Sequence, residues 1–561
     1  MSLDLAPLKA NSSSPPASTT SPLTPRQVVF DRLAIALFVV LAILIFSTFR
    51  DYGITWDEPE NDHYGYLIVK YYLALLHGKY DSGAVTVHGI SIYGGLFNTL
   101  QTLAIAVLPF GAYESRHLIN ALAGLLGIIG CWKLGRLLGG PAGGFWAALL
   151  MAATPRFYGA MFNNPKDIPS AVAYVWSIYY LAMAYRFLPR LPWALVLKLG
   201  LSIGCALAIR TGAFLLLFYM GLIWIAFLLR QLFNKEPRAA ITSSAFAMTK
   251  SFAAIAGIAW ALMLLFWPWA QQQPIFRPFE SAKTFLHYPW DHLVLYNGVL
   301  LRSLDVPRTY MTRWLFMTSP ELTLVLLAAG LVIAVVMLWR NRLQLGAATI
   351  ISFGIVVLSV LFPIAIALAT RPVFYDAERH FTYVIPPAVC LAAAVLAGAE
   401  LLNRKVRIAI YTVAGACIIY QGSLMFRLHP NEYVYFNQIS GGLSAAYRKY
   451  DTDYWGNSYR EAVKSLAGYL TAVEEPAQSK HYTVMTFSER LQSTYYFPKW
   501  MTYVKQPDQA DFIVSITRDG MDESVDGTPI LTVSRLGVPL AIVKDRRSLK
   551  GIAPRGWYSH P

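Results

Sequence analysis

The sequence predicts a polytopic α-helical membrane protein with about 11 transmembrane helices and a small C-terminal α/β domain. Of its 561 residues, 56% are hydrophobic and only 14% are charged, whereas a soluble globular domain carries about 25% charged residues. Apolar runs of membrane length recur as far as Met425. Beyond Arg427 the charge rises and short alternating runs appear, such as Tyr482–Phe487 and Ala510–Ile516, which are typical of strands.

Apolar runs of about 17–25 residues predict the membrane spans. The eleven runs are Leu33–Phe49, Leu118–Leu134, Leu138–Tyr158, Ile168–Tyr185, Trp193–Ile209, Gly212–Leu229, Phe252–Trp269, Leu322–Trp339, Leu345–Ala369, Phe381–Leu402 and Ile408–Met425. A twelfth apolar run, Tyr93–Ala112, is left out of the count. We expect it to lie in or along the outer leaflet as part of the first outer loop.

The charges of the loops predict the orientation of these spans. With the N-terminus in the cytoplasm, five cytoplasmic loops are basic and only Glu236 opposes them. Their basic residues are Lys133, Arg136, Arg186, Arg190, Lys198, Arg230, Lys235, Arg238, Lys250, Arg340, Arg342, Arg404, Lys405 and Arg407. Counting Tyr93–Ala112 as a span would invert every later loop and destroy this positive-inside pattern.

The chain therefore divides into three predicted parts. Residues 1–32 form a cytoplasmic tail, which we expect to be disordered because its first 24 residues are rich in Ser, Pro and Thr. A cleaved signal peptide is disfavoured, because no hydrophobic run lies near Met1. Residues 33–426 form the transmembrane domain, with a first outer loop over residues 50–117. Residues 427–561 form an extracytoplasmic α/β domain of ordinary domain size.

Several classes of protein are disfavoured. The formal net charge of +15 would suggest nucleic-acid binding in a soluble protein, but here the basic residues serve topology, so no nucleic acid is expected as a partner. The four cysteines lie inside apolar runs and are interpreted as packing residues. The sequence contains no GxxxxGK[ST] phosphate loop and no HExxH motif.

The acidic pair Asp57-Glu58 follows the first apolar run directly. It could be a solvated loop pair, or an N-cap pair for a helix beginning near Pro59. The interpretation we favour is a general base facing a substrate borne by the bilayer, whose basicity partial desolvation raises.

Further polar residues fall at outer helix ends. Asp167 is either a helix cap or a group that faces a cavity. Arg116, Arg210 and Arg379 are each either an interfacial anchor or, if they converge, part of a phosphate site that arginine's forked donors suit. The stretch Asp453-Tyr454-Trp455-Gly456 is either a groove for an acceptor or, as we favour, a buried structural corner.

These residues together resemble the GT-C superfamily of membrane glycosyltransferases, specifically glycosyltransferase family 39 and its bacterial relatives, which include protein O-mannosyltransferases and the aminoarabinose transferases of lipid A. The resemblance covers about Leu33 to Met425. The segments that carry it are Thr55-Trp56-Asp57-Glu58, Arg116-His117-Leu118-Ile119-Asn120-Ala121, Gly135-Arg136-Leu137-Leu138-Gly139-Gly140 with Pro155, Asp167-Ile168-Pro169, and, more weakly, Glu378-Arg379-His380-Phe381 with Pro386-Pro387.

The resemblance implies an inverting transfer from a polyprenyl-phosphate sugar. It implies Asp57 as the base with Glu58 beside it, Asp167 as the second acidic position that orients substrate, and Arg116 as the arginine that approaches the donor phosphate. Arg210 and Arg379 are the other candidates for that phosphate, because arginine side chains stabilise charge that grows on a leaving phosphate.

One departure concerns the first outer loop. Aminoarabinose transferases carry Lys-Pro-Pro there, whereas this chain reads Val87-His88-Gly89-Ile90. Either His88 takes the place of the lysine as a phosphate contact, or that contact is missing. The C-terminal part also differs from the β-trefoil domain of eukaryotic O-mannosyltransferases.

The sequence therefore predicts a multi-pass glycosyltransferase of the inner (plasma) membrane. Its donor is a polyprenyl-phosphate-linked sugar, and its acceptor at the outer, periplasmic face is a lipid, glycan or protein. Acidic residues alone do not define a metal site, so a divalent cation stays open as a cofactor. The alternatives are a transporter or lipid flippase without transferase activity, and a non-catalytic assembly factor.

Overall fold

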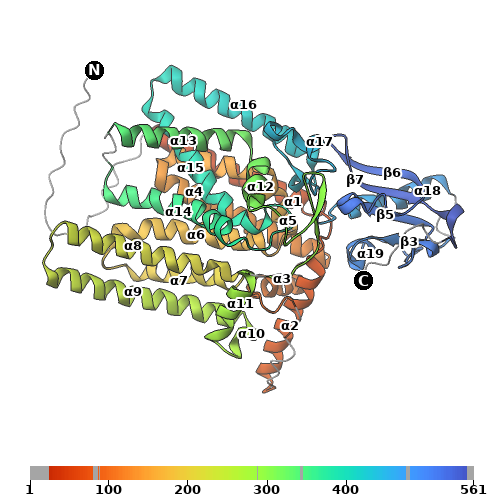
Figure 1. The fold of residues 1–561 in the computed structure, drawn as a ribbon, viewed down its shortest axis with the longest axis horizontal. Helices are drawn as coiled ribbons and strands as arrows, with labels where there is room; N and C mark the ends of the chain where they lie inside the picture. The colour runs from red at the N-terminus through yellow and green to blue at the C-terminus, as the bar shows by residue number, and fades with distance from the viewer. Residues whose placement is uncertain are drawn as a thin grey trace.

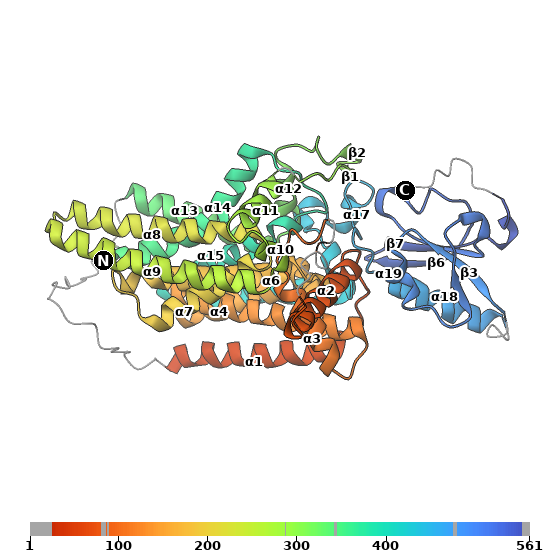
Figure 2. The ribbon, with the colours of Figure 1, turned by 90° about the horizontal axis from the view of Figure 1, so that it is seen from below.

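The computed structural model describes residues 25–79, 86, 89–286, 288–340, 345–474 and 480–552. Long helices lie side by side along one direction, and a small α/β domain lies at one end of this bundle (Figure 1). The view from below shows the same arrangement, with helix α1 on the edge of the bundle (Figure 2). The predicted fold class, a helical membrane protein with a small C-terminal α/β domain, is confirmed.

Nearly the whole transmembrane part is helical, because its apolar runs satisfy their backbone groups within each segment. In order, its helices are α1 (Pro25–Thr48), α2 (Glu58–Leu76), α3 (Leu96–Val107), α4 (Ala112–Ala152), α5 (Pro155–Asn163), α6 (Asp167–Ala184), α7 (Trp193–Leu207), α8 (Phe214–Phe233), α9 (Arg238–Leu265), α10 (Pro268–Gln271), α11 (Phe276–Leu286), α12 (Tyr310–Thr318), α13 (Glu321–Trp339), α14 (Ala347–Thr370), α15 (Ile385–Ala397) and α16 (Arg404–Leu428). A short hairpin, β1 (Leu293–Tyr296) with β2 (Val299–Arg302), stands between α11 and α12.

Within the described residues, eight helices are long and apolar enough to cross a membrane, against the eleven runs predicted. The difference has two sources. Helix α4 contains the predicted run Leu118–Leu134 and most of Leu138–Tyr158, joined across a kink at Gly139 and Gly140, and the last residues of the second run lie in α5. Helices α6 and α7 hold two more, with 18 and 15 residues, and neither is among the eight. Helix α3 lies in the run Tyr93–Ala112, which was left out of the eleven, so it does not contribute to the difference. It has 12 residues, too few to span the hydrocarbon core.

The first boundary differs from the prediction. Helix α1 begins at Pro25, so the end of the predicted tail, 1–32, is helical. Residues 1–24 lie outside the described residues.

The C-terminal domain is built on a five-stranded mixed sheet with strand order β4-β3-β5-β7-β6. Its strands are β3 (Tyr482–Thr486), β4 (Met501–Tyr503), β5 (Phe512–Ile516), β6 (Thr528–Arg535) and β7 (Val538–Asp545). Strand β3 pairs in parallel with β4 and β5, whereas β7 pairs antiparallel with β5 and β6. Helix α18 (Tyr459–Val473) buries Tyr459, Leu466 and Leu470 in one core with the sheet. The remaining short helices are α17 (Gly442–Ala446) and α19 (Arg490–Thr494).

The first loop and the C-terminal domain meet at the same end of the bundle. The backbone N–H of Trp56 donates to the carbonyl of Trp455 at 3.1 Å, and that of Gly53 donates to Oδ1 of Asn457 at 2.6 Å. This end is the predicted outer face. Its orientation relative to the cytoplasm stays a prediction from the loop charges.

The kink of α4 generates a prediction. Gly140 has φ 64° and ψ −164°, a conformation that only glycine adopts readily, and a Cβ there would meet open space. The substitution Gly140→Ala should therefore cost about 1–3 kcal/mol through backbone strain alone. In detergent, its thermal unfolding midpoint should lie below that of the wild type.

The control is Gly257→Ala in α9, where a Cβ also meets open space but φ is not positive. Alanine in a helix interior is favoured over glycine by about 1 kcal/mol, so this variant should unfold at or above the wild-type temperature. Equal midpoints for the two variants would contradict the strain at Gly140.

Candidate functional site

Asp57 stands at the start of α2 with its carboxylate turned away from the helix. It occupies the N-cap position and Pro59 fills the first turn, but its side chain makes no capping hydrogen bond. Instead, Oδ2 accepts a hydrogen bond from Nη1 of Arg379 at 2.9 Å. The carboxylate is 29% exposed. Of the two interpretations weighed for this residue, the geometry favours a carboxylate that faces a site.

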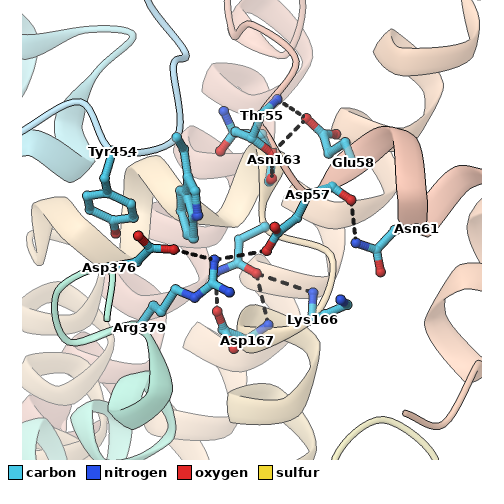
Figure 3. Close-up of polar contacts among 12 residues, drawn as sticks. Thr55, Asp57, Glu58, Asn61, Asn163, Lys166, Asp167, Asp376, Arg379 and Tyr454 are labelled. Carbon is cyan, nitrogen blue, oxygen red and sulfur yellow. Dashed lines mark hydrogen bonds and ion pairs between the residues drawn. The ribbon is translucent and has the colours of Figure 1, made fainter. Parts of the chain in front are cut away.

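Three cations surround this carboxylate, and we call Lys166, Arg210 and Arg379 the cationic cluster. Arg379 points its guanidinium at Asp57 (Figure 3), and Lys166 and Arg210 come close enough for their charges to lower the pKa of Asp57. Lys166 Nζ lies 4.4 Å and the Arg210 guanidinium carbon 5.6 Å from the ring centre of Tyr93, so both cations contact the same aromatic ring.

Asp167 enters the same site from the start of α6. Its Oδ1 forms an ion pair with Nη2 of Arg210. Asn164 fixes its position, since Oδ1 of Asn164 accepts from the Asp167 backbone N–H at 2.9 Å and Nδ2 donates to the Asp167 carboxylate at 2.9 Å. Asp167 is the first residue of α6, but its side chain makes no capping hydrogen bond. Of the two possibilities considered for it, the geometry favours a carboxylate that reaches the cationic cluster.

The cationic cluster sets the ionisation of Asp57. Burial works to raise the pKa of its carboxyl group, but Arg379, Lys166 and Arg210 together lower the pKa below the ordinary value of 3.8. The expectation that desolvation makes Asp57 more basic is therefore wrong for the unliganded protein. Burial in turn lowers the pKa of Lys166 from its ordinary value.

Glu58 points the other way and is 1% exposed. Its carboxylate accepts from the Thr55 backbone N–H at 2.7 Å and from the Thr55 hydroxyl at 3.1 Å, as in one half of a capping box. His117 Nε2 lies 3.1 Å from its other oxygen. These contacts tie the loop to α4 and leave Glu58 no free face toward the cationic cluster (Figure 3), so the structure corrects its predicted place beside the base.

Arg116 does not join the cationic cluster, although the sequence grouped it with Arg210 and Arg379. It is fully buried and its Nη1 donates to Asp62 at 2.7 Å. No hydrogen bond or ion pair joins it to the cationic cluster within the described residues, and its predicted contact with the donor phosphate stays a prediction. His88 lies outside the described residues.

Sequence reasoning missed two members of the site. Lys166 stands beside Asp167 in the same segment, and a lysine directly preceding a helix-opening acid was the available signal. Asp376 binds Arg379 at 3.3 Å from the same loop (Figure 3). Trp455 belongs to the expected structural corner, and its ring also lies 5.8 Å from the Arg379 guanidinium.

The arrangement can hold an anion between cations beside a carboxylate. The buried Nε atoms of Arg210 and Arg379 have no hydrogen-bond partner within the described part of the chain. A buried donor without a partner is costly, and an anionic oxygen would satisfy it. No group of three or more His, Cys, Asp or Glu residues that could hold a metal ion occurs among the described residues.

Part of the chain matches one protein-family model. Residues 96–249 match the family model described as dolichyl-phosphate-mannose-protein mannosyltransferase. No curated protein sequence matches the chain.

Distant likenesses occur among solved structures. For ArnT from Cupriavidus metallidurans in the apo state, the identity is 12%, the match covers 92% of this chain and 98% of that chain, and the TM-score is 0.47. For the oligosaccharyltransferase AglB from Archaeoglobus fulgidus, the identity is 13%, the match covers 86% of this chain and 69% of that chain, and the TM-score is 0.46. For the arabinofuranosyltransferase AftD from Mycobacteria, the identity is 12%, the match covers 94% of this chain and 42% of that chain, and the TM-score is 0.40.

The wall of the site depends on Asn457. Its Oδ1 accepts from the Gly53 N–H at 2.6 Å and from Asn163 at 3.0 Å, and its Nδ2 donates to the carbonyl of Pro430 at 2.9 Å and to Asn431 at 2.6 Å. One buried amide thus joins the first loop, the end of α5 and the C-terminal domain.

Replacing Asn457 by alanine should lower the free energy of unfolding by about 2–4 kcal/mol, because it leaves several buried polar groups unpaired. The control is Asn403→Ala, which removes the exposed cap of α16 and should cost about 1 kcal/mol. Thermal unfolding of the purified protein measures both. A smaller loss at Asn457 than at Asn403 would contradict the described role.

Proposed function

We propose a reaction for this chain on the premise that its family match supplies, namely that it is a membrane glycosyltransferase of the kind that uses polyprenyl-phosphate sugars. In this proposal the enzyme is inverting and acts at the outer face of the inner membrane. It transfers the sugar from the polyprenyl phosphate to a hydroxyl or other nucleophile of a lipid, glycan or protein acceptor.

One observation carries the proposal. The buried Nε donors of Arg210 and Arg379 have no partner among the described residues, and the two arginines share a site with Lys166 and the ionised carboxylate of Asp57. Arginine recognises phosphate oxygens through several N–H groups held in one plane. A carboxylate beside such an anion site is the arrangement that transfer from a sugar phosphate needs, since one group binds the leaving phosphate and the other takes the acceptor's proton.

In the proposed step, the acceptor oxygen attacks the anomeric carbon from the face opposite the phosphate. The bond between that carbon and the phosphate oxygen breaks, and its electron pair leaves with the polyprenyl phosphate. The acceptor's proton passes to Asp57. The leaving phosphate gains one negative charge, which Lys166, Arg210 and Arg379 stabilise without any protonation by a separate acid.

The shared arginine also links donor binding to the basicity of Asp57. In the free protein, Arg379 and its neighbours hold the pKa of Asp57 low, which makes the carboxylate a weak base. A bound phosphate places negative charge against the same cations and offsets their effect on Asp57, so the pKa of Asp57 rises when the donor is in place. The base is thus strengthened only in the complex that uses it.

A transporter or flippase would need charged groups along a pathway through the membrane. In the described structure, the members of the site stand at the ends of helices. Asp57 begins α2, Asp167 begins α6 and Arg210 follows α7. This placement favours chemistry at one membrane surface over transport across it.

The proposal predicts that Asp57→Asn lowers kcat by about 10²–10⁴-fold, the usual contribution of a general base, while the protein still binds undecaprenyl phosphate. The measurement is transfer by purified protein supplied with polyprenyl-phosphate sugars and envelope acceptors. Asp291→Asn is the control, because Asp291 pairs with Arg302 on the exposed surface. Full transfer activity in Asp57→Asn would contradict the role of this residue.

Arg379→Gln should change the pH dependence of the reaction. Asp57 is ionised in the free wild-type enzyme from pH 5 to 8, because its pKa lies below 3.8, so its protonation should not reduce kcat/KM in that range. Without Arg379, the largest influence that lowers this pKa is lost while burial still raises it. The pKa therefore rises, and the acid limb of kcat/KM should move to higher pH.

Arg379→Lys keeps the positive charge and should keep the acid limb near its wild-type position. Profiles of kcat/KM against pH for the three proteins test this, since kcat/KM reports ionisations of the free enzyme. An acid limb in Arg379→Gln that stays at or below the wild-type position would contradict the electrostatic account.

A further inference from the structure

An arginine of the C-terminal domain reaches the candidate site. Arg518 follows β5 after a single residue and is 13% exposed. Its Nη1 donates to the carbonyl of Tyr454 at 2.7 Å, and its Nη2 donates to Oδ1 of Asp376 at 3.0 Å. Its guanidinium carbon lies 5.9 Å from the ring centre of Trp56, beside Asp57 in the chain.

The contacts continue through Asp376 to the base. The second oxygen of Asp376 lies 3.3 Å from Nη1 of Arg379, and this same Nη1 donates to Asp57 at 2.9 Å (Figure 3). Arg518, Asp376, Arg379 and Asp57 therefore form a line of alternating charges, which we call the ion-pair line. It crosses from the C-terminal domain into the proposed donor site.

The backbone around Asp376 is held in an uncommon conformation. Asp376 and Ala377 have φ of 54° and 64°, in the left-handed region that residues other than glycine seldom occupy. The N–H of Ala377 donates to the Tyr310 hydroxyl at 3.2 Å. Strained residues persist where their surroundings fix them, and they gather at functional sites. Asp376 is thus aimed between the two arginines.

Arg518 pairs with a second carboxylate besides Asp376, because Oδ2 of Asp519 lies 3.4 Å from its Nε. Asp451 lies nearby, but burial, together with Asp519, raises its pKa to about 8. At neutral pH Asp451 is therefore mostly protonated. Arg518 engages Asp376 through Nη2 and Asp519 through Nε, and Asp376 is the one that also contacts Arg379.

We infer that Arg518 is a positioning residue that lets Arg379 act on the donor phosphate. Arg379 and Arg518 share the negative charge of Asp376, so Asp376 binds Arg379 less strongly than it would alone. The Arg379 guanidinium can therefore also bind Asp57 and the phosphate. Without Arg518, Arg379 would be the one cationic partner of Asp376 left in the described part of the chain, and Asp376 would draw Arg379 away from Asp57 and the phosphate. The C-terminal domain thereby completes the donor site, and this inference rests on the proposed function.

The test is a double-mutant cycle on Arg518 and Asp376. Arg518→Ala should raise the KM for the polyprenyl-phosphate donor about tenfold with a smaller change in kcat. Asp376→Asn should have a smaller effect, because it removes the charge that competes for Arg379. In the double variant, the donor KM should return to within about threefold of Asp376→Asn, since interacting residues are not additive in their effects. Arg518→Lys should recover part of the loss.

The matched control is Arg535→Ala. Arg535 also ties the C-terminal domain to the membrane domain, through the carbonyls of Leu428 and His429, and its side chain is 10% exposed. It makes no contact with Asp376, so this variant should keep the wild-type donor KM.

A second readout does not depend on turnover. The rise in melting temperature produced by undecaprenyl phosphate should shrink in Arg518→Ala and return in the double variant. If these melting-temperature shifts are observed but the wild-type protein transfers no sugar, the positioning role of Arg518 is supported and the proposed reaction is refuted. Two results overturn the inference: additive losses in the double variant, or an Arg535→Ala defect equal to that of Arg518→Ala.

Discussion

The pairing of Asp57 with Arg379 is the interaction on which the rest of the site depends. A carboxylate at a membrane surface, largely enclosed by protein, is stable in its charged form only when cations compensate it. Arg379 supplies this compensation at 2.9 Å. The surrounding structure fixes the pair from both sides, because Glu58, Thr55 and His117 hold the loop that carries Asp57, and Asp376 with Arg518 holds Arg379.

This compensation is incomplete in a way that suits a ligand. Asp57, Asp167 and Asp376 oppose the three cations of the cationic cluster. Even so, the Nε donors of Arg210 and Arg379 have no partner within the described structure. The site is therefore complementary to a phosphate that carries negative charge when it binds and more when it leaves. In this account, these cations bind the donor and stabilise the leaving group, and the bound phosphate offsets their effect on Asp57 and so raises the pKa of Asp57.

The sequence predicted the fold class because hydrophobic run length and loop charge depend on local composition. It also identified Asp57, Asp167, Arg210 and Arg379, which the structure brings together from four separate segments. It failed where the outcome depended on the direction of a side chain. Arg116 sits at a helix end like the other arginines, but the first turns of α4 bury it against Asp62, and Glu58 differs from its neighbour Asp57 only in the side of the loop to which it points.

Arg518 shows the same limit at the longest range. Nothing in its local sequence distinguishes it from the other arginines of the C-terminal domain, and its contact with Asp376 exists only because the sheet docks on the loops of the bundle. The span count differed for a similar reason. Run length alone does not reveal that Gly139 and Gly140 join two spans into one kinked helix, or that α7 has only 15 residues.

The most direct measurement is a structure of the purified protein with undecaprenyl phosphate bound, determined by cryo-electron microscopy. The account predicts that the phosphate lies against Lys166, Arg210 and Arg379, with the Asp57 carboxylate across the site from the phosphorus. A phosphate bound beside Arg116, or on any surface away from Asp57, would contradict the central claim.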